Sequence, residues 1–126
     1  MPLVRIDLRA GRSPAVRQAL GEAVHQAMVE TLKVPADDRF QVITEHAAEG
    51  MVYDPAYLGI ARSDGVVFIQ ITLNAGRTVE QKRALYARIA ELAGRHAEVR
   101  PEDLLVSLVE VTKENWSFGN GMAQYA

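Results

Sequence analysis

The chain of 126 residues contains an internal repeat, and this repeat limits its possible folds more than any other feature of the sequence. When the sequence is shifted by 65 positions, its two halves align without a gap. The matched pairs include Ile6 and Ile71, Leu8 and Leu73, Arg12 and Arg77, Val34 and Val99, Asp38 and Asp103, and Glu45 and Glu110. Chance matches would scatter over many offsets. The shared offset therefore indicates two copies of one structural unit, in residues of about 2–46 and 67–111.

Each copy has the pattern of a strand, a helix and a second strand. In the first copy, residues 3–9 alternate between apolar and polar side chains, which is typical of a half-buried strand. Ser13 is a suitable N-cap and Pro14 suits the first helical position. Apolar residues then recur at helical spacing to about Leu32, and residues 39–45 form the next predicted strand.

The second copy repeats this order with more apolar strands. The pattern predicts strands over 66–73 and 104–111, and a helix from an N-cap at Thr78 to about Gly94. Both strands are apolar on both sides, so we expect both of their faces to be covered.

These elements predict a single domain over 1–126 of the α/β (α+β) class, made of a duplicated β-α-β unit. Each unit implies a parallel, right-handed crossover, and two units give a four-stranded mixed sheet with two helices on one face. A partner subunit is the simplest cover for the other face. We expect residues 47–65 to form a loop with at most a short hairpin, and the tail around 116–121 to form a small hairpin that reaches a neighbour.

Composition narrows the function classes. The net charge of −2 gives no reason to expect a nucleic acid or an acidic membrane surface as a partner, and the absence of cysteine excludes a thiolate nucleophile. The N-terminal residues lack the apolar core of a signal peptide, and no apolar run approaches membrane-spanning length. No pair of the three histidines has metal-ligand spacing. We expect a soluble, cytoplasmic protein that binds no metal.

Pro2 is the candidate for the main catalytic group. A proline nitrogen within a peptide bond is not basic, but removal of Met1 would make it a secondary amine on a rigid ring. An α-amino group titrates at about 7.7–8.0, so modest shifts of its pKa decide whether it acts as a base or as an acid. Nearby cations or burial would lower this pKa, and a nearby carboxylate would raise it.

Four segments, MPLVRIDL, VPADDRFQ, AGRT followed by Gln81-Lys82, and WSFGNG, carry a resemblance over nearly the whole chain. Together with the repeat and Pro2, they resemble the tautomerase superfamily, and within it the branch of malonate semialdehyde decarboxylase. The resemblance implies a homotrimer with active sites near the subunit boundaries. It also implies that neither a metal nor an organic cofactor is needed.

Arg77 follows the third predicted strand at the start of the second helix. A guanidinium can hold a carboxylate through two N–H groups, and a helix N-terminus favours anions. The resemblance implies that Arg77 binds the carboxylate of the substrate. A surface arginine is the alternative, and this is our interpretation of its repeat mate Arg12. Ala75 stands where some decarboxylase relatives carry a second arginine, so the resemblance also fits relatives that use one arginine.

The resemblance places further candidates around Pro2. Asp38 would lie close to it and raise the pKa of its amine, or position a water; the alternative is a turn residue, and the neighbouring Asp37 competes for the role. Trp116 and Phe118 would form an apolar wall or anchor the tail. Leu73 is a candidate for substrate contact, although its place on a predicted strand favours the core.

The sequence therefore predicts an enzyme that depends on Pro2 and acts on a small β-carbonyl carboxylate. The reaction that fits best resembles decarboxylation of malonate semialdehyde to acetaldehyde, with possible hydratase activity. One alternative is a 2-keto acid tautomerase of the phenylenolpyruvate type, in which Pro2 is the general base. Another is a non-catalytic trimeric binding protein on the same scaffold.

Overall fold

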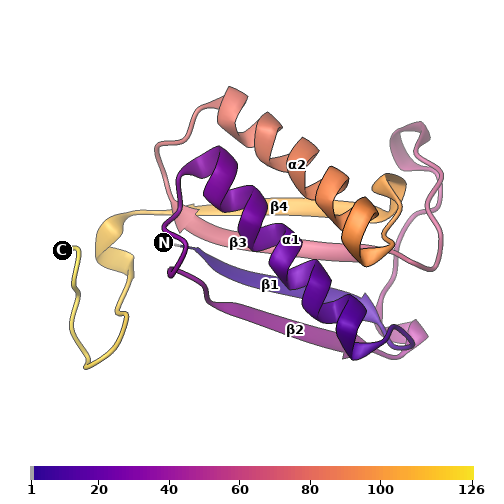
Figure 1. Ribbon diagram of the computed structural model, residues 1–126, viewed down its shortest axis with the longest axis horizontal. Helices are drawn as coiled ribbons and strands as arrows, with labels where there is room; N and C mark the ends of the chain where they lie inside the picture. The colour runs from indigo at the N-terminus through magenta and orange to yellow at the C-terminus, as the bar shows by residue number, and fades with distance from the viewer. Residues whose placement is uncertain (1) are drawn as a thin grey trace.

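The computed structural model describes residues 2–126, and the predicted removal of Met1 concerns a residue outside this range. Figure 1 shows a sheet with two helices lying across one of its faces. The elements are β1 (Leu3–Arg9), α1 (Pro14–Leu32), β2 (Gln41–His46), β3 (Val67–Asn74), α2 (Val79–Ala97) and β4 (Leu104–Val111). None of the helices in residues 2–126 is both long and apolar enough to cross a membrane.

The sheet has four strands in the order β2-β1-β3-β4. β1 is parallel to β2, β3 is parallel to β4, and the two halves join through the antiparallel pair of β1 and β3. Each β-α-β unit therefore forms one half of a mixed sheet, and both helices cover the same face (Figure 1). The predicted fold is confirmed.

The core lies between the sheet and the helices. The inward residues of β1, Val4, Ile6 and Leu8, are at most 1% exposed. α1 and α2 pack against each other over this face, and the fully buried Leu20 and Leu85 occupy matching positions in the repeat. Burial of such side chains stabilises the fold by about 1.5–3 kcal/mol each, relative to exposure.

The repeat extends to details of the backbone. Gly11 and Gly76 both have a positive φ, at 126° and 123°, in the turns before the helices. Lys33 and Glu98 end the helices in the left-handed conformation, at φ 60° and 57°. These turns have the same geometry because each closes the same strand-helix-strand unit.

Matching ion pairs also follow the repeat. Arg17 Nη1 lies 3.1 Å from Glu45 Oε1 in the first copy. Lys82 Nζ lies 2.8 Å from Glu110 Oε1 in the second copy. Each pair ties the first turns of a helix to the end of the following strand.

The sheet face opposite the helices keeps apolar side chains exposed in a single chain. Val42 is 40% exposed, Leu105 48% and Val109 38%. The alternation along β4 directs every second side chain to this face, as the apolar pattern of residues 104–111 predicts.

Several predicted boundaries differ from the structure by one to three residues. β2 spans Gln41–His46 rather than 39–45, and β3 spans Val67–Asn74 rather than 66–73. α2 continues past Gly94 to Ala97, whose side chain is fully buried. This burial favours the additional helical residues over an early end at glycine.

The two irregular segments differ in how well they were predicted. The loop between β2 and β3 contains two short 3₁₀ turns, Ala48–Gly50 and Tyr57–Gly59, and no strand in its described residues.

The prediction of a hairpin in the tail is wrong. Its described residues form a 3₁₀ turn, Lys113–Asn115, and later turns without strand pairing, and Figure 1 shows the tail extending past the end of the sheet.

Candidate active site

Pro2 directly precedes β1, one of the two inner strands of the sheet, and it is buried. On one side, Leu3 pairs with Thr72 of the antiparallel β3. Continued by one residue, this register sets Pro2 beside Leu73, at a strand spacing of about 4.8 Å. β3 ends at the next residue, and Arg77 follows across the turn.

On the other side of Pro2 lies the start of the parallel strand β2. Val4 pairs with Gln41, so the same register sets Pro2 beside Arg39, the residue after Asp38. The fold therefore places the two predicted polar candidates on opposite flanks of Pro2, Asp38 toward β2 and Arg77 toward β3.

A pocket opens at Pro2. It has a volume of about 220 Å³ and is lined by Pro2, Leu3, Phe40, Trp116, Ser117 and Phe118. Its lining is apolar apart from the hydroxyl of Ser117 and the backbone. The structure thus brings three of the predicted site residues, Pro2, Trp116 and Phe118, into one pocket.

Aromatic rings build one wall of this pocket. Trp116 and Phe118 are stacked, with ring centroids 5.3 Å apart and an angle of 15° between the rings. Phe118 also contacts Phe40, at 6.3 Å, and meets the edge of Tyr125 at 5.5 Å. Offset and edge contacts of this kind stabilise a packed cluster, so the tail is held to the pocket by its rings.

Arg77 lies beside this wall and is half-buried. Its Nη1 donates a hydrogen bond to the backbone oxygen of Asn74, at 3.0 Å. The side-chain oxygen of Asn74 accepts a hydrogen bond from Trp116 Nε1, at 2.8 Å. A guanidinium has five N–H donors, and the bond to Asn74 uses one of them.

Asp38 is 7% exposed at the end of the turn before β2. Its backbone nitrogen donates to Pro35 O at 3.0 Å, and His25 Nε2 lies 2.9 Å from Ala36 O, which braces the same turn from α1. The competing candidate, Asp37, is exposed. Of the two candidates, Asp38 is therefore the buried carboxylate of this turn.

The repeat mate of Asp38 is held by two hydrogen bonds. Asp103 Oδ1 accepts a hydrogen bond from Ser63 N, and Asp103 Oδ2 accepts one from Ser63 Oγ, both at 2.7 Å. Ser63 belongs to the segment that enters β3, and a shift of 65 positions would set it before residue 1, so Ser63 has no counterpart in the first copy.

Leu73 is not in the pocket. It is 2% exposed and belongs to the core together with Ile71, which is fully buried. The alternation along β3 directs both side chains toward the helices, so the predicted substrate contact of Leu73 has no surface in this chain.

Charge near Arg77 is balanced by Glu110 at the end of β4. The hydrogen bond and charge of Lys82 lower the pKa of Glu110 below its usual value, and the charge of Arg77 contributes to the same shift. Glu110 therefore stays ionised at neutral pH, and its negative charge lies near the positive charges of Lys82 and Arg77.

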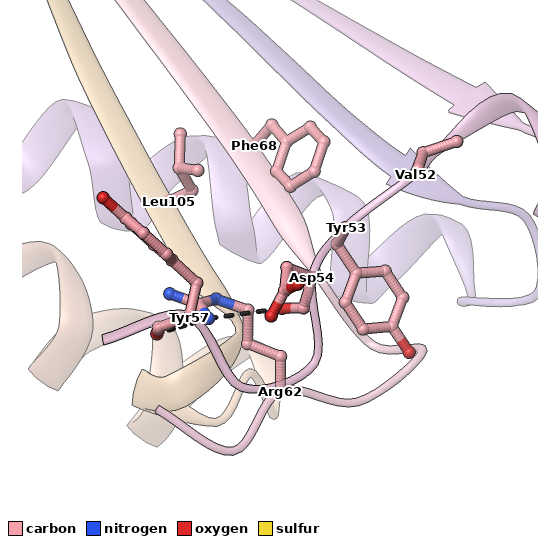
Figure 2. A pocket seen from close by; sticks show the side chains of 7 residues that line it. All are labelled: Val52, Tyr53, Asp54, Tyr57, Arg62, Phe68 and Leu105. Atoms are coloured by element: carbon pink, nitrogen blue, oxygen red, sulfur yellow. Dashed lines mark hydrogen bonds between the residues drawn. The ribbon is translucent and has the colours of Figure 1, made fainter. Parts of the chain in front are cut away.

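A second pocket, also of about 220 Å³, lies at the opposite end of the sheet, where Phe68 pairs with Leu105. Figure 2 shows Arg62 below it, bonded to the loop. Arg62 Nη1 donates to the backbone oxygens of Asp54 and Tyr57, at 3.3 and 2.9 Å. This guanidinium braces the loop, and the pocket contains no candidate nucleophile comparable to Pro2.

Four residues of the site were not predicted from the sequence, namely Leu3, Phe40, Asn74 and Ser117. Leu3, Phe40 and Ser117 lie within the segments MPLVRIDL, VPADDRFQ and WSFGNG, so their positions in the motifs could have suggested them. Asn74 carried a weaker signal, as a polar residue ending an apolar strand.

The sequence matches family models described as tautomerase enzyme, over residues 38–119 and over residues 2–61. The probable tautomerase YusQ of Bacillus subtilis (strain 168) is 46% identical over 124 residues, which cover 98% of both chains. This chain belongs to the tautomerase superfamily. The probable tautomerase YrdN of the same organism is 35% identical over 125 residues, 99% of this chain and 96% of YrdN.

Solved structures place the chain in the malonate semialdehyde decarboxylase-like branch of this superfamily. The FG41 malonate semialdehyde decarboxylase inhibited by 3-bromopropiolate matches with a TM-score of 0.93 and 42% identity, over 98% of this chain and 93% of that one. A second malonate semialdehyde decarboxylase, solved to explain its decarboxylase and hydratase activities, matches with a TM-score of 0.92 and 36% identity, over 98% and 95%. The chain is thus an enzyme of the isomerase or lyase class.

Proposed function

We propose that this enzyme decarboxylates a small β-carbonyl carboxylate of the malonate semialdehyde type, using the amine of Pro2. The observation that carries the proposal is the position of Pro2 in a small apolar pocket, with Arg77 and Asp38 on its two flanks. The likeness to two malonate semialdehyde decarboxylases, at 42% and 36% identity, supports the same reaction.

In this mechanism Arg77 binds the carboxylate of the substrate and Pro2 acts on the carbonyl. The Pro2 ammonium donates a hydrogen bond to the carbonyl oxygen, or Pro2 forms an iminium with the carbonyl carbon and releases water. The bond between the α-carbon and the carboxylate then breaks, and its electrons move toward the oxygen or the nitrogen. Protonation of the α-carbon, and hydrolysis on the iminium route, gives acetaldehyde beside carbon dioxide.

The apolar wall contributes to the same step. A carboxylate loses its charge as it leaves as neutral carbon dioxide, and a surface of aromatic rings solvates the charged form poorly. Trp116 and Phe118 therefore favour the departure, provided that Arg77 holds the carboxylate at the edge of the wall.

Asp38 keeps Pro2 in its charged form. A carboxylate close to an amine favours the ammonium and raises its pKa. The same carboxylate can accept a proton from a water, which would account for a hydratase side activity.

A tautomerase acting on 2-keto acids of the phenylenolpyruvate type is the second candidate, with Pro2 as general base. Two observations favour it. The related proteins of Bacillus subtilis (strain 168) are probable tautomerases. Ala75 stands where a second arginine would strengthen the grip on a carboxylate, so the site has fewer cations than some decarboxylase relatives.

A homotrimer is part of the proposal. Val42, Leu105 and Val109 are exposed on the bare face of the sheet, and partner subunits would bury them. A fused 4-oxalocrotonate tautomerase, which shares the fold at a TM-score of 0.80 and 24% identity, is a symmetric trimer. The mass of the particle in solution tests this: three chains of 13.9 kDa each are expected, and a monomer would contradict it.

A paired assay on one preparation tests the reaction. Carbon dioxide release from malonate semialdehyde and ketonisation of phenylenolpyruvate are measured side by side, with Pro2→Ala as the matched control. The proposal expects the first reaction to have the higher kcat/KM and to depend on Pro2. Faster ketonisation would favour the tautomerase, and the absence of both reactions would contradict both candidates.

A further inference from the structure

Asn74 contacts both Arg77 and Trp116 of the aromatic wall, and the proposed reaction requires these two groups to act on one carboxylate. Its backbone oxygen accepts a hydrogen bond from Arg77 Nη1 at 3.0 Å, and its side-chain oxygen accepts one from Trp116 Nε1 at 2.8 Å. We propose that Asn74 is a positioning residue, which fixes the distance between the apolar wall and the guanidinium. This inference rests on the proposed function.

The tail has no strand pairing, so another contact must fix Trp116 relative to the sheet. Residues 112–126 extend past the end of the sheet and form no strand in the described structure (Figure 1). Trp116 and Asn74 are 42 positions apart in the sequence, and their hydrogen bond ties the tail to the last residue of β3. Because Trp116 stacks on Phe118, fixing the indole also fixes the second ring of the wall.

Asn74 is itself rigidly placed. It pairs with Val111 at the end of β4, and the next residue, Ala75, donates its N–H to Val111 O at 2.9 Å. The C-terminal ends of β3 and β4 are therefore joined at the residue whose side chain holds Trp116. Because the acceptor is already fixed, the hydrogen bond to the indole has a small entropic cost. The bond therefore holds the tail against the end of β3.

The two bonds of Asn74 can be separated by mutation. Arg77 uses the backbone oxygen, which survives a change of side chain, whereas Trp116 uses the side-chain oxygen. Asn74→Leu removes the acceptor at similar volume, and Asn74→Asp keeps an oxygen at the same place. The first variant should release Trp116 and leave Arg77 in position, and the second should retain both.

Fluorescence without any substrate tests the anchor. Trp116 is the single tryptophan of the chain, so the intrinsic emission reports its surroundings alone. In Asn74→Leu we expect a red-shifted emission maximum and stronger quenching by acrylamide, and in Asn74→Asp a spectrum like that of the wild type. An unchanged spectrum and unchanged quenching in Asn74→Leu would overturn the inference, whatever the reaction of the enzyme.

Ligand binding and kinetics test the positioning. Propanoate, a three-carbon carboxylate that cannot lose carbon dioxide in this way, is titrated by its effect on Trp116 emission. Loss of one hydrogen bond predicts roughly a three- to tenfold rise in Kd for Asn74→Leu. With malonate semialdehyde, kcat/KM should fall by at least the same factor, because the displaced wall no longer favours the departure of carbon dioxide.

A double variant distinguishes positioning from a general loss of stability. Trp116→Phe keeps a ring but lacks the N–H donor, so it should lower kcat/KM as Asn74→Leu does. If both act through one bond, the double variant should be no worse than either single variant. Multiplied effects, or a kcat/KM of Asn74→Leu equal to that of the wild type, would overturn the inference. If the wild type shows no turnover, the proposed function fails, and the fluorescence and propanoate results still decide the role of Asn74.

Discussion

Asp103 accepts two hydrogen bonds from Ser63, one from the backbone N–H and one from the hydroxyl, both at 2.7 Å. The carboxylate is 3% exposed, and it fixes the segment that enters β3. Its repeat mate Asp38 is also buried and lies in the turn before β2, the strand on one flank of Pro2. One position of the repeat thus fixes a loop in the second half and has a role in the proposed chemistry in the first.

Replacement of Asp103 by Ala should destabilise the protein. The backbone N–H and the hydroxyl of Ser63 would each lose a hydrogen bond to the carboxylate. Loss of one such bond costs about 1.5–3 kcal/mol. The thermal midpoint, measured at a fixed protein concentration because assembly affects it, should fall by several degrees. An unchanged midpoint would mean that this pair does not fix the loop.

Replacement of Asp38 by Asn should shift the pH dependence of kcat/KM. In the proposed mechanism a carboxylate beside Pro2 favours its ammonium form, so removal of this charge should favour the neutral amine. If the ammonium is the active form, activity is lost as the pH rises through the pKa of this amine, and the alkaline limb should move to lower pH. If the free amine is the active form, the acidic limb should move instead.

The matched control is Asp37→Asn, which changes an exposed carboxylate in the same turn. It should leave both limbs in place. Equal shifts in the two variants would point to the general charge of the turn, and no shift in Asp38→Asn would remove Asp38 from the mechanism.

Arg77→Ala should weaken binding of the substrate carboxylate. Loss of one partner of a hydrogen-bonded charge pair costs about 2–5 kcal/mol, which corresponds to roughly a 30-fold or larger rise in KM. Arg12→Ala is the repeat-matched control. Arg12 Nη2 donates to Gly65 O at 2.7 Å, at the other end of the sheet, so this variant should lower the thermal midpoint and leave KM within about twofold. A similar rise in KM in both variants would contradict the assignment.

The ion pair of Lys82 and Glu110 predicts an acid-sensitive part of the stability. The hydrogen bond and charge of Lys82 lower the pKa of Glu110 in the folded chain below its ordinary value of 4.5. A lowered carboxylate pKa stabilises the fold above the unfolded pKa, and this contribution is lost as the pH falls through the folded value. Glu110→Gln should therefore lower the thermal midpoint at pH 7, and the difference from the wild type should disappear at acidic pH. A difference that is constant with pH would contradict this.

The repeat made most of the fold predictable. Gly11 with Gly76, and Ser13 with Thr78, mark the same turn and cap twice, so the order of strands and helices followed from local signals. Pro2 was predicted as the main catalytic group because loss of Met1 would unblock its amine, and because the repeat and the motifs resemble the tautomerase superfamily.

Contacts between distant segments were not predictable in this way. The hydrogen bond between Asn74 and Trp116 joins the end of β3 to a tail without regular structure. No spacing in the sequence indicates this bond. The tail was expected to form a hairpin because glycine and aromatic residues suit one. In the structure, stacking of its rings on the pocket replaces strand pairing.

The proposed reaction depends on the N-terminal amino group of Pro2, which removal of Met1 would unblock. It is tested by kcat/KM for carbon dioxide release from malonate semialdehyde, compared between Pro2→Ala and a wild-type preparation whose intact mass shows that Met1 is absent. We expect a fall of at least about 100-fold in the variant, with its circular dichroism and thermal midpoint retained. A variant within a few-fold of the wild type, or full activity in protein that keeps Met1, would contradict it.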